Sequence, residues 1–145
     1  MKLVIQRVSS AKVEVDGKTI SEIGKGMLIL LGIAREDDGT QMKWLANKAV
    51  EMRIFEDDAG LMNRSLLEIE GDILLVSQFT LYADCHKGKR PGFTDAALPD
   101  KAEKMYEEFA EILRTRNVTL KTGIFGAHMH VSLVNDGPVT IILER

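Results

Sequence analysis

The stretch Ile73-Leu74-Leu75-Val76-Ser77-Gln78-Phe79-Thr80-Leu81-Tyr82 is the strongest strand signal in the chain. Its first four residues are apolar, so both faces start apolar, which is typical of a strand covered on both sides. Polar groups then enter each face, with Ser77 on one and with Gln78 and Thr80 together on the other. A buried hydroxyl or carboxamide without a partner costs about 1–3 kcal/mol. These side chains therefore either bond neighbouring backbone, the common outcome, or point into a polar cavity.

Upstream of this strand the sequence predicts a meander of short strands. Apolar residues alternate with polar ones from residue 3 to residue 15. Asp16-Gly17 then gives a strong hairpin signal, because a type I′ turn requires positive φ at both central positions. Residues 19–23 form the return strand, and the apolar run Met27–Ile33 predicts another strand that is buried on both faces.

The hydrophobic period changes to that of a helix in two places. The first helix is expected over residues 40–52, with Thr40 as its N-terminal cap. The second is expected to open at Pro99 or Asp100 and to end near residue 117. Its apolar face consists of Ala102, Met105, Tyr106, Phe109, Ile112 and Leu113.

The C-terminal segment predicts a short strand and a second hairpin. Residues 118–122 form the short strand, and residues 129–134 and 139–143 flank the turn Asn135-Asp136-Gly137-Pro138. Since X-Pro bonds are cis in only about 5–6% of folded cases, the residues alone favour a trans bond. Two helices among many strands favour an α+β fold, namely a mostly antiparallel, curved, barrel-like β-sheet with two main helices packed against it.

Length and composition restrict the class of protein. The chain of 145 residues is 45% hydrophobic and 28% charged, which predicts a single domain over residues 1–145. The lone Cys85 excludes an intrachain disulfide framework and suits a reducing compartment. The longest apolar run is far shorter than the about 20 residues of a membrane helix, and the N-terminus lacks the pattern of a signal peptide. We therefore expect a cytoplasmic protein with no membrane partner.

The charge balance bears on nucleic-acid binding. The formal net charge is −3, whereas proteins that hold nucleic acid by bulk electrostatics carry a basic excess. We therefore expect no DNA partner. Any RNA contact would be local, and the best candidate is Lys87, Lys89 and Arg90 on the long loop 84–98. An ordinary solvated loop explains the same residues.

Two further side-chain pairs are weighed and discounted. His128 and His130 share a face of the predicted strand, but no Cys, Asp or Glu stands at a spacing that would complete a metal site. Cys85-His86 are neighbours on a loop, and such neighbours rarely form a nucleophile–base pair. The sequence thus predicts neither a metal nor a cofactor.

Two motifs taken together resemble the D-aminoacyl-tRNA deacylase family. The first is Ser77-Gln78-Phe79-Thr80-Leu81 ahead of the loop Lys87-Gly88-Lys89-Arg90-Pro91-Gly92-Phe93. The second is Asn135-Asp136-Gly137-Pro138-Val139-Thr140 near the C-terminus. The similarity extends over essentially the whole chain, from Gln6-Arg7-Val8 to the last strand, without a departure at either motif.

This resemblance implies a small barrel-like α+β unit that forms a homodimer and hydrolyses aminoacyl-tRNA. The Gly137-Pro138 peptide is expected to be cis and to enter the pocket of the partner subunit. The substrate is tRNA that carries a D-amino acid or, in some cases, glycine. The implied catalytic residues are Ser77, Gln78, Phe79 and Thr80, and the implied substrate-binding residues are Gly137, Pro138 and Arg7, which would brace the Gly-Pro loop. Phe125 and Met129 precede the predicted second hairpin and are candidates to line the pocket for the terminal adenine, but core packing explains them equally well. The tRNA contact is assigned to Lys87, Lys89 and Arg90.

The chemistry leaves the nucleophile open. An aminoacyl ester is already activated, so hydrolysis needs an oxyanion site and a delivered nucleophile. Backbone N–H groups near Gln78 and Phe79 are candidates for the oxyanion site. Thr80 has no His, Asp or Glu within three residues to activate it. The alternative, which we favour, is assistance by the 2′-hydroxyl of the substrate, with Thr80 as a positioning group.

Two rival functions remain at this stage. A noncatalytic RNA-binding or assembly module would explain the missing triad and metal ligands, but aromatic residues, the usual stacking platforms for bases, make up only 6% of the chain. A general small-ester hydrolase is the other rival. Activity on paired D- and L-aminoacyl-tRNA separates the three.

Overall fold

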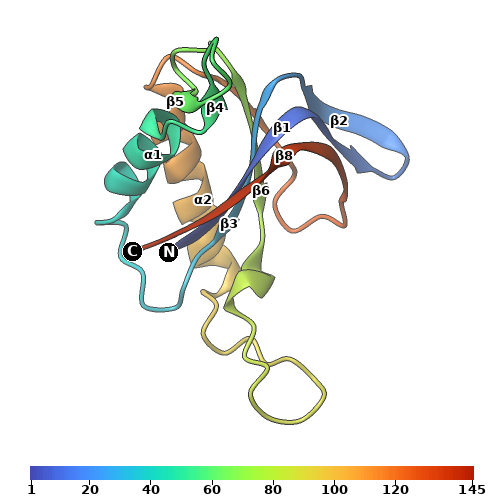
Figure 1. Cartoon of the computed structure of the whole chain (residues 1–145). Helices are drawn as coiled ribbons and strands as arrows, with labels where there is room; N and C mark the ends of the chain where they lie inside the picture. The colour runs from blue at the N-terminus through green and yellow to red at the C-terminus, as the bar shows by residue number, and fades with distance from the viewer.

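Figure 1 shows the fold in a computed structural model that describes residues 1–145. The elements in chain order are β1 (Lys2–Val15), β2 (Lys18–Ile23), β3 (Gly26–Gly32), α1 (Met42–Glu51), β4 (Phe55–Glu56), β5 (Met62–Arg64), β6 (Asp72–Ser77), the 3₁₀ helix η1 (Phe79–Tyr82), α2 (Pro99–Arg114), β7 (Thr119–Thr122) and β8 (His130–Glu144). Neither α-helix is long and apolar enough to cross a membrane.

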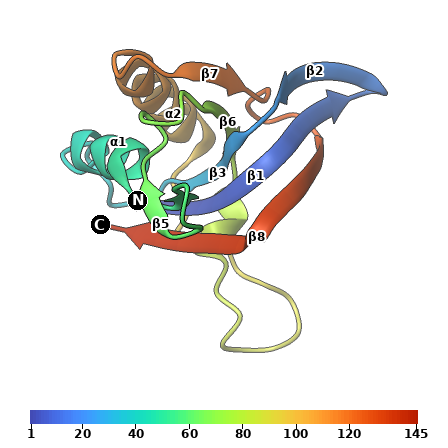
Figure 2. The same ribbon diagram turned by 45° about the horizontal axis from the view of Figure 1, so that its top comes forward.

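The main sheet is mixed, with the order β2-β1-β3-β6-β7 and with β8 on β1. β1 pairs antiparallel with β2, β3 and β8, whereas β3–β6 and β6–β7 are parallel. The expected α+β class with two helices and a barrel-like sheet is confirmed, but the expectation of a mostly antiparallel sheet is wrong. Each parallel pair needs a crossover connection. α1 lies in the first crossover and α2 in the second, side by side on one side of the sheet (Figures 1 and 2).

The two central strands are buried on both faces, as their apolar runs predict. On the face that carries the helices, Ile29 and Ile73 belong to the larger core cluster together with residues of α1 and α2. On the other face, Leu28 and Leu74 belong to a smaller cluster of seven buried residues. This double coverage fixes β6, and therefore fixes where its C-terminal end emerges.

Of two predictions from local sequence, the Asp16-Gly17 turn is confirmed and the Thr40 helix cap is wrong. Asp16 and Gly17 have φ of +50° and +74° in the β1–β2 turn, as the hairpin prediction requires. Thr40, by contrast, does not cap α1, because the cap position is Gln41 and no side chain bonds there. The Thr40 hydroxyl donates instead to the Asp38 carboxylate over 2.8 Å.

The predicted strand over residues 73–82 is wrong beyond Ser77. β6 pairs with β3 only as far as Ser77, and the chain then turns into η1. Gly32 at the end of β3 explains this turn, since a Cβ there would lie 3.0 Å from the Leu81 Cβ and 3.2 Å from the Gln78 carbonyl oxygen. The missing side chain lets η1 fold over the end of β3. Gln78 and Thr80 therefore do not lie on one strand face.

The predicted second hairpin is also wrong. Residues 130–144 form one strand, β8, and both of its halves pair with β1 rather than with each other. The pairs Val8–Asn135 and Gln6–Thr140 leave residues 136–139 opposite Arg7 alone. Because β1 is 14 residues long, it gives both halves a continuous pairing partner. Residues 136–139, which we call the Gly-Pro bulge, are extra residues of β8 without pairing partners of their own on β1.

Candidate active site

The segment Ser77–Thr80, which we call the polar turn, lies where β6 passes into η1, with Ser77 and Gln78 half-buried and Phe79 and Thr80 exposed. The Gln78 side-chain amide donates a hydrogen bond to the Thr80 hydroxyl, the only hydrogen bond that this hydroxyl shares with another side chain. The Gln78 N–H donates to the Leu31 carbonyl over 2.8 Å and is therefore not available as an oxyanion donor. The Phe79 N–H, at the first position of η1, has no protein acceptor. The Phe79 ring is 56% exposed and contacts Phe93 edge-on with 5.0 Å between centroids.

The Gly-Pro bulge has a defined conformation. The Gly137–Pro138 peptide bond is cis, as the family resemblance implies, and Gly137 has a φ of +134° that residues with a side chain rarely adopt. The Asn135 side chain closes its neck: the amide oxygen accepts the Val139 N–H over 3.0 Å, and the amide nitrogen donates to the Thr140 hydroxyl over 3.0 Å. Gly137 and Pro138 are exposed residues.

Arg7 supports this bulge from within the protein. The side chain is buried at 4% exposure, and Nε donates to the Asp136 carbonyl over 2.9 Å. A terminal nitrogen donates to the Ile54 carbonyl over 2.8 Å, and the other lies 3.4 Å from the Glu56 carboxylate. A buried cation needs such pairing because an isolated charge in the interior is strongly disfavoured. The structure thus brings Arg7 and the Gly-Pro bulge together.

The polar turn and the Gly-Pro bulge do not meet within one chain. The bulge lies opposite Arg7, whereas Ser77 is level with Leu31, which pairs with Leu3. Arg7 and Leu3 are four residues apart along β1, or about 13 Å. β6 and β8 are also separated by β3 and β1, which adds about 14 Å across the sheet. The polar turn and the Gly-Pro bulge are therefore two separate places within one chain.

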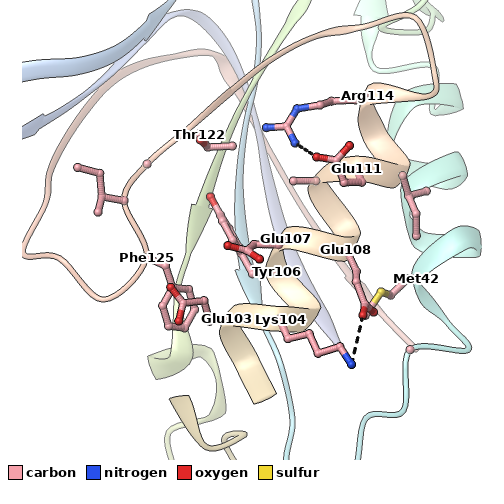
Figure 3. Close-up of a pocket in the computed structure, with 15 residues that line it drawn as sticks. Met42, Glu103, Lys104, Tyr106, Glu107, Glu108, Glu111, Arg114, Thr122 and Phe125 are labelled. Carbon is pink, nitrogen blue, oxygen red and sulfur yellow. Dashed lines mark hydrogen bonds and ion pairs between the residues drawn. The ribbon is translucent and has the colours of Figure 1, made fainter. Parts of the chain in front are cut away.

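A cavity of about 970 Å³ lies between α2 and the segment Thr122–Phe125 (Figure 3). Phe125 lines it, and its ring lies 5.9 Å from that of Tyr106. The buried Tyr106 hydroxyl donates to the Leu75 carbonyl over 2.9 Å, and burial raises the pKa of this phenol, which keeps it protonated as a donor. Met129 does not line the cavity, because it packs against the smaller core cluster beside Gly123.

The three basic residues of the long loop are exposed at its tip. Asp84 and Gly92 exchange two backbone hydrogen bonds of 2.8 Å that close the base of the loop. Lys87, Lys89 and Arg90 lie between them in the sequence and are exposed, and the loop as a whole extends away from the sheet beyond η1 (Figure 1). The rings of His128 and His130 contact each other at 5.3 Å, and no group of three or more His, Cys, Asp or Glu residues in the chain is arranged to hold a metal ion.

Sequence reasoning missed several supports of the site. Glu56 and the Ile54 carbonyl come from a short hairpin far from either motif, and no local pattern marks them. Tyr106 was assigned only to the apolar face of a helix. Asn135 belongs to the quoted motif, and its closing role follows only from the bulge geometry.

The fold and the site together define a small α+β protein whose candidate reaction centre is an exposed turn of backbone and hydroxyl groups, without an acid–base triad beside it. The sequence matches the family described as D-Tyr-tRNA(Tyr) deacylase over residues 4–144. The chain belongs to this family of hydrolases, and the resemblance carried by the two motifs is confirmed.

Relatives described as D-aminoacyl-tRNA deacylases align with 99% of this chain. A D-aminoacyl-tRNA deacylase of Thermosipho africanus (strain TCF52B) is 55% identical over 144 residues, 99% of this chain and 97% of the relative. One of Thermomicrobium roseum (strain ATCC 27502 / DSM 5159 / P-2) is 56% identical over 99% of this chain and 94% of its own length.

Two solved structures share the fold. One described as c-Myc DNA Unwinding Element Binding Protein aligns with a TM-score of 0.94 and 44% identity over 100% of this chain and 99% of that chain. One described as a probable eukaryotic D-amino acid tRNA deacylase aligns with a TM-score of 0.82 over 98% of this chain and 97% of that chain. At 17% identity, the second supports the fold alone.

Proposed function

We propose that the polar turn Ser77–Thr80 is the centre at which this protein hydrolyses the ester of D-aminoacyl-tRNA, releasing free tRNA and the D-amino acid. The observation that carries the assignment is the exposed Phe79 N–H, which lacks a protein acceptor, next to a Thr80 hydroxyl held by Gln78. An N–H group fixed by the backbone can stabilise a developing oxyanion without reorganising. Ser77 and Gln78 support this turn from the end of β6.

The route of attack follows from the partners of Thr80. Its hydroxyl accepts the hydrogen bond of the Gln78 amide, and no base contacts it to remove its proton. Thr80 is therefore suited to donate to the substrate and to orient the ester. The 2′-hydroxyl of the terminal ribose then assists water, as an activated ester allows. No metal or cofactor is part of this proposal.

A homodimer completes the pocket in this proposal. The turn and the bulge lie about 13 Å apart along the strands and about 14 Å across them, too far to hold one aminoacyl group. A two-fold axis would place the bulge of each chain onto the turn of the other. Large apolar side chains that remain exposed near these two segments support such a contact: Phe79, Phe93, Val134 and Ile142.

The selection of D over L rests on backbone atoms of the Gly-Pro bulge. The carbonyls of Gly137 and Pro138 would hold the α-amino group, and the polar turn would fix the ester. With both ends fixed, the side chain of an L-residue points into the wall and is rejected sterically. Glycine has no side chain to exclude and is accepted. Arg7 holds the bulge in place.

The tRNA itself would contact the loop that carries Lys87, Lys89 and Arg90, close to η1. Phe125 would line the space for the terminal adenine, whereas the packing of Met129 gives it an indirect role behind Gly123. The reaction belongs where aminoacyl-tRNA is used, in the cytoplasm. The expectation of no DNA partner stays a prediction. It is tested by competition of labelled duplex DNA with tRNA.

One set of assays tests the proposed function. Initial rates are measured on D-aminoacyl-tRNA, on L-aminoacyl-tRNA and on a simple D-amino acid ester without RNA. The proposal predicts cleavage of the first alone at a substantial rate. Comparable cleavage of the simple ester would favour the general small-ester hydrolase, and binding of tRNA without cleavage would favour the noncatalytic module.

A further inference from the structure

The guanidinium group of Arg7 is bracketed between the β4–β5 hairpin and the Gly-Pro bulge. On the hairpin side it contacts the Ile54 carbonyl and the Glu56 carboxylate, and on the bulge side it contacts the Asp136 carbonyl. A guanidinium is a planar, rigid fork. The groups that hold its terminal nitrogens therefore also set the direction in which Nε donates to the bulge.

The nitrogen that faces Glu56 is also the one nearest the bulge glycine. Nη2 lies 3.4 Å from the Glu56 carboxylate oxygen, and a Cβ built on Gly137 would lie 3.0 Å from the same Nη2. Nη2 therefore occupies the space beside Gly137 in which a side chain would begin. The only other carboxylate on Arg7 is Asp136, at 3.7 Å from Nε, so Glu56 is the sole carboxylate on the hairpin side.

The hairpin holds Glu56 in a fixed position. The preceding residue, Phe55, is buried in the larger core cluster. The following residue, Asp57, organises the turn, since its carboxylate accepts the backbone N–H groups of Ala59 and Leu61 and the side-chain amide of Asn63. These hydrogen bonds lower the pKa of Asp57 and keep it an acceptor. The Glu56 side chain itself is 58% exposed, so replacing it leaves the core intact.

We propose that Glu56 is a positioning residue for D-aminoacyl-tRNA hydrolysis, acting through Arg7 to hold the Gly-Pro bulge. This inference rests on the proposed role of the bulge in binding the amino group. Glu56 touches no substrate. Its carboxylate holds Nη2 in place beside Gly137. Because the guanidinium group is rigid, this also fixes the direction in which Nε donates to the Asp136 carbonyl.

Kinetics of the full-length protein with Glu56→Ala test this proposal. We expect kcat for D-aminoacyl-tRNA to fall about two- to fivefold with KM little changed, as suits a half-exposed ion pair that acts on positioning. Glu56→Asp should recover part of the loss. The matched control is Asp58→Ala, because Asp58 lies in the same hairpin, is 94% exposed and pairs with Arg64 instead. It should behave as the unaltered protein.

Two further measurements assign the effect to Arg7. In an Arg7→Lys background, Glu56→Ala should cause no additional loss of kcat, since both changes disrupt the same contact between Glu56 and Arg7. Hydrogen exchange of the Val139 amide, which is bonded to Asn135, should be faster in Glu56→Ala than in Asp58→Ala. Unchanged exchange of the Val139 amide, or a loss of kcat that adds fully to that of Arg7→Lys, would overturn the proposal. If exchange accelerates while activity stays constant, the bulge has no role in the reaction, and the proposed function of Gly137-Pro138 fails instead.

Discussion

Replacing Gly137 by Ala should disable the Gly-Pro bulge while leaving the fold intact. The new Cβ would lie 2.9 Å from the Val139 side chain, 3.0 Å from Arg7 Nη2 and 3.1 Å from the Val139 backbone nitrogen. The φ of +134° is also unfavourable for alanine, at a cost of about 1–3 kcal/mol. The contact with the Val139 backbone nitrogen cannot be relieved by the rotation of a side chain. The bulge must therefore shift, and the carbonyls that hold the amino group shift with it.

The expected loss can be scaled from that strain. If the displaced bulge stabilises the transition state by about 1–3 kcal/mol less, kcat for D-aminoacyl-tRNA falls about 5- to 150-fold. Activity on L-aminoacyl-tRNA should not appear, because the bulge is displaced rather than opened toward the L side chain. The control is Gly17→Ala, because Gly17 also has a positive φ, of +74°, but a Cβ there would have nothing within 4 Å.

The assay is single-turnover hydrolysis of D- and L-aminoacyl-tRNA at equal enzyme, together with thermal unfolding of both variants. We expect both variants to remain folded and only Gly137→Ala to lose activity. Full activity of Gly137→Ala would refute the reasoning that this backbone positions the amino group. Efficient cleavage of the L-substrate by this variant would refute steric rejection by the bulge.

Three other outcomes are expected. Changing Lys87, Lys89 and Arg90 together to Ala should raise KM for aminoacyl-tRNA and flatten its salt dependence, and no change in either would mean a solvated loop. Thr80→Ala should retain turnover, whereas tRNA ending in 2′-deoxyadenosine should lose most of it; an acyl-enzyme trapped on Thr80 would reverse that assignment. Phe79→Pro should abolish turnover because it removes the N–H at a helix position that tolerates proline, whereas Phe79→Ala should keep kcat within about tenfold.

The elements that depend on local patterning were predictable from the sequence. The apolar runs of β3 and β6 fixed two strands covered on both faces, and the helical spacing located α1 and α2 within a few residues. Asp16-Gly17 gave the correct turn because positive φ at both positions is a local requirement. The two motifs gave the family because their combination is specific.

What failed depends on contacts between distant segments. The end of β6 is set by Gly32 on another strand, so the apolar pattern through Tyr82 was misleading. The Gly-Pro segment has the composition of a hairpin turn, but β1 offers both halves of β8 a longer partner. The parallel pairs β3–β6 and β6–β7 arise because the crossovers that contain α1 and α2 return the chain in the same direction. The composition of the strands does not reveal this.

The position of the site residues shows the same division. The polar turn could be named from its motif, but the engagement of the Gln78 N–H by Leu31 requires the structure. The supports of the bulge, Glu56 and the Ile54 carbonyl, come from a hairpin with no signature of function. For Met129 the sequence left pocket lining and core packing open, and the structure packs it against the smaller core cluster.

The most direct test of the account mixes two damaged chains. Gly137→Ala impairs the bulge and Phe79→Pro impairs the polar turn, so each homodimer carries two defective pockets. Differently tagged chains are coexpressed, and the mixed dimer is isolated through both tags and assayed on D-aminoacyl-tRNA. If each pocket combines the turn of one chain with the bulge of the other, the mixed dimer has one intact pocket and recovers about half the unaltered activity per dimer. If it is no more active than the better homodimer, or if the protein is an active monomer by sedimentation, the pocket is not shared between chains and the account is wrong.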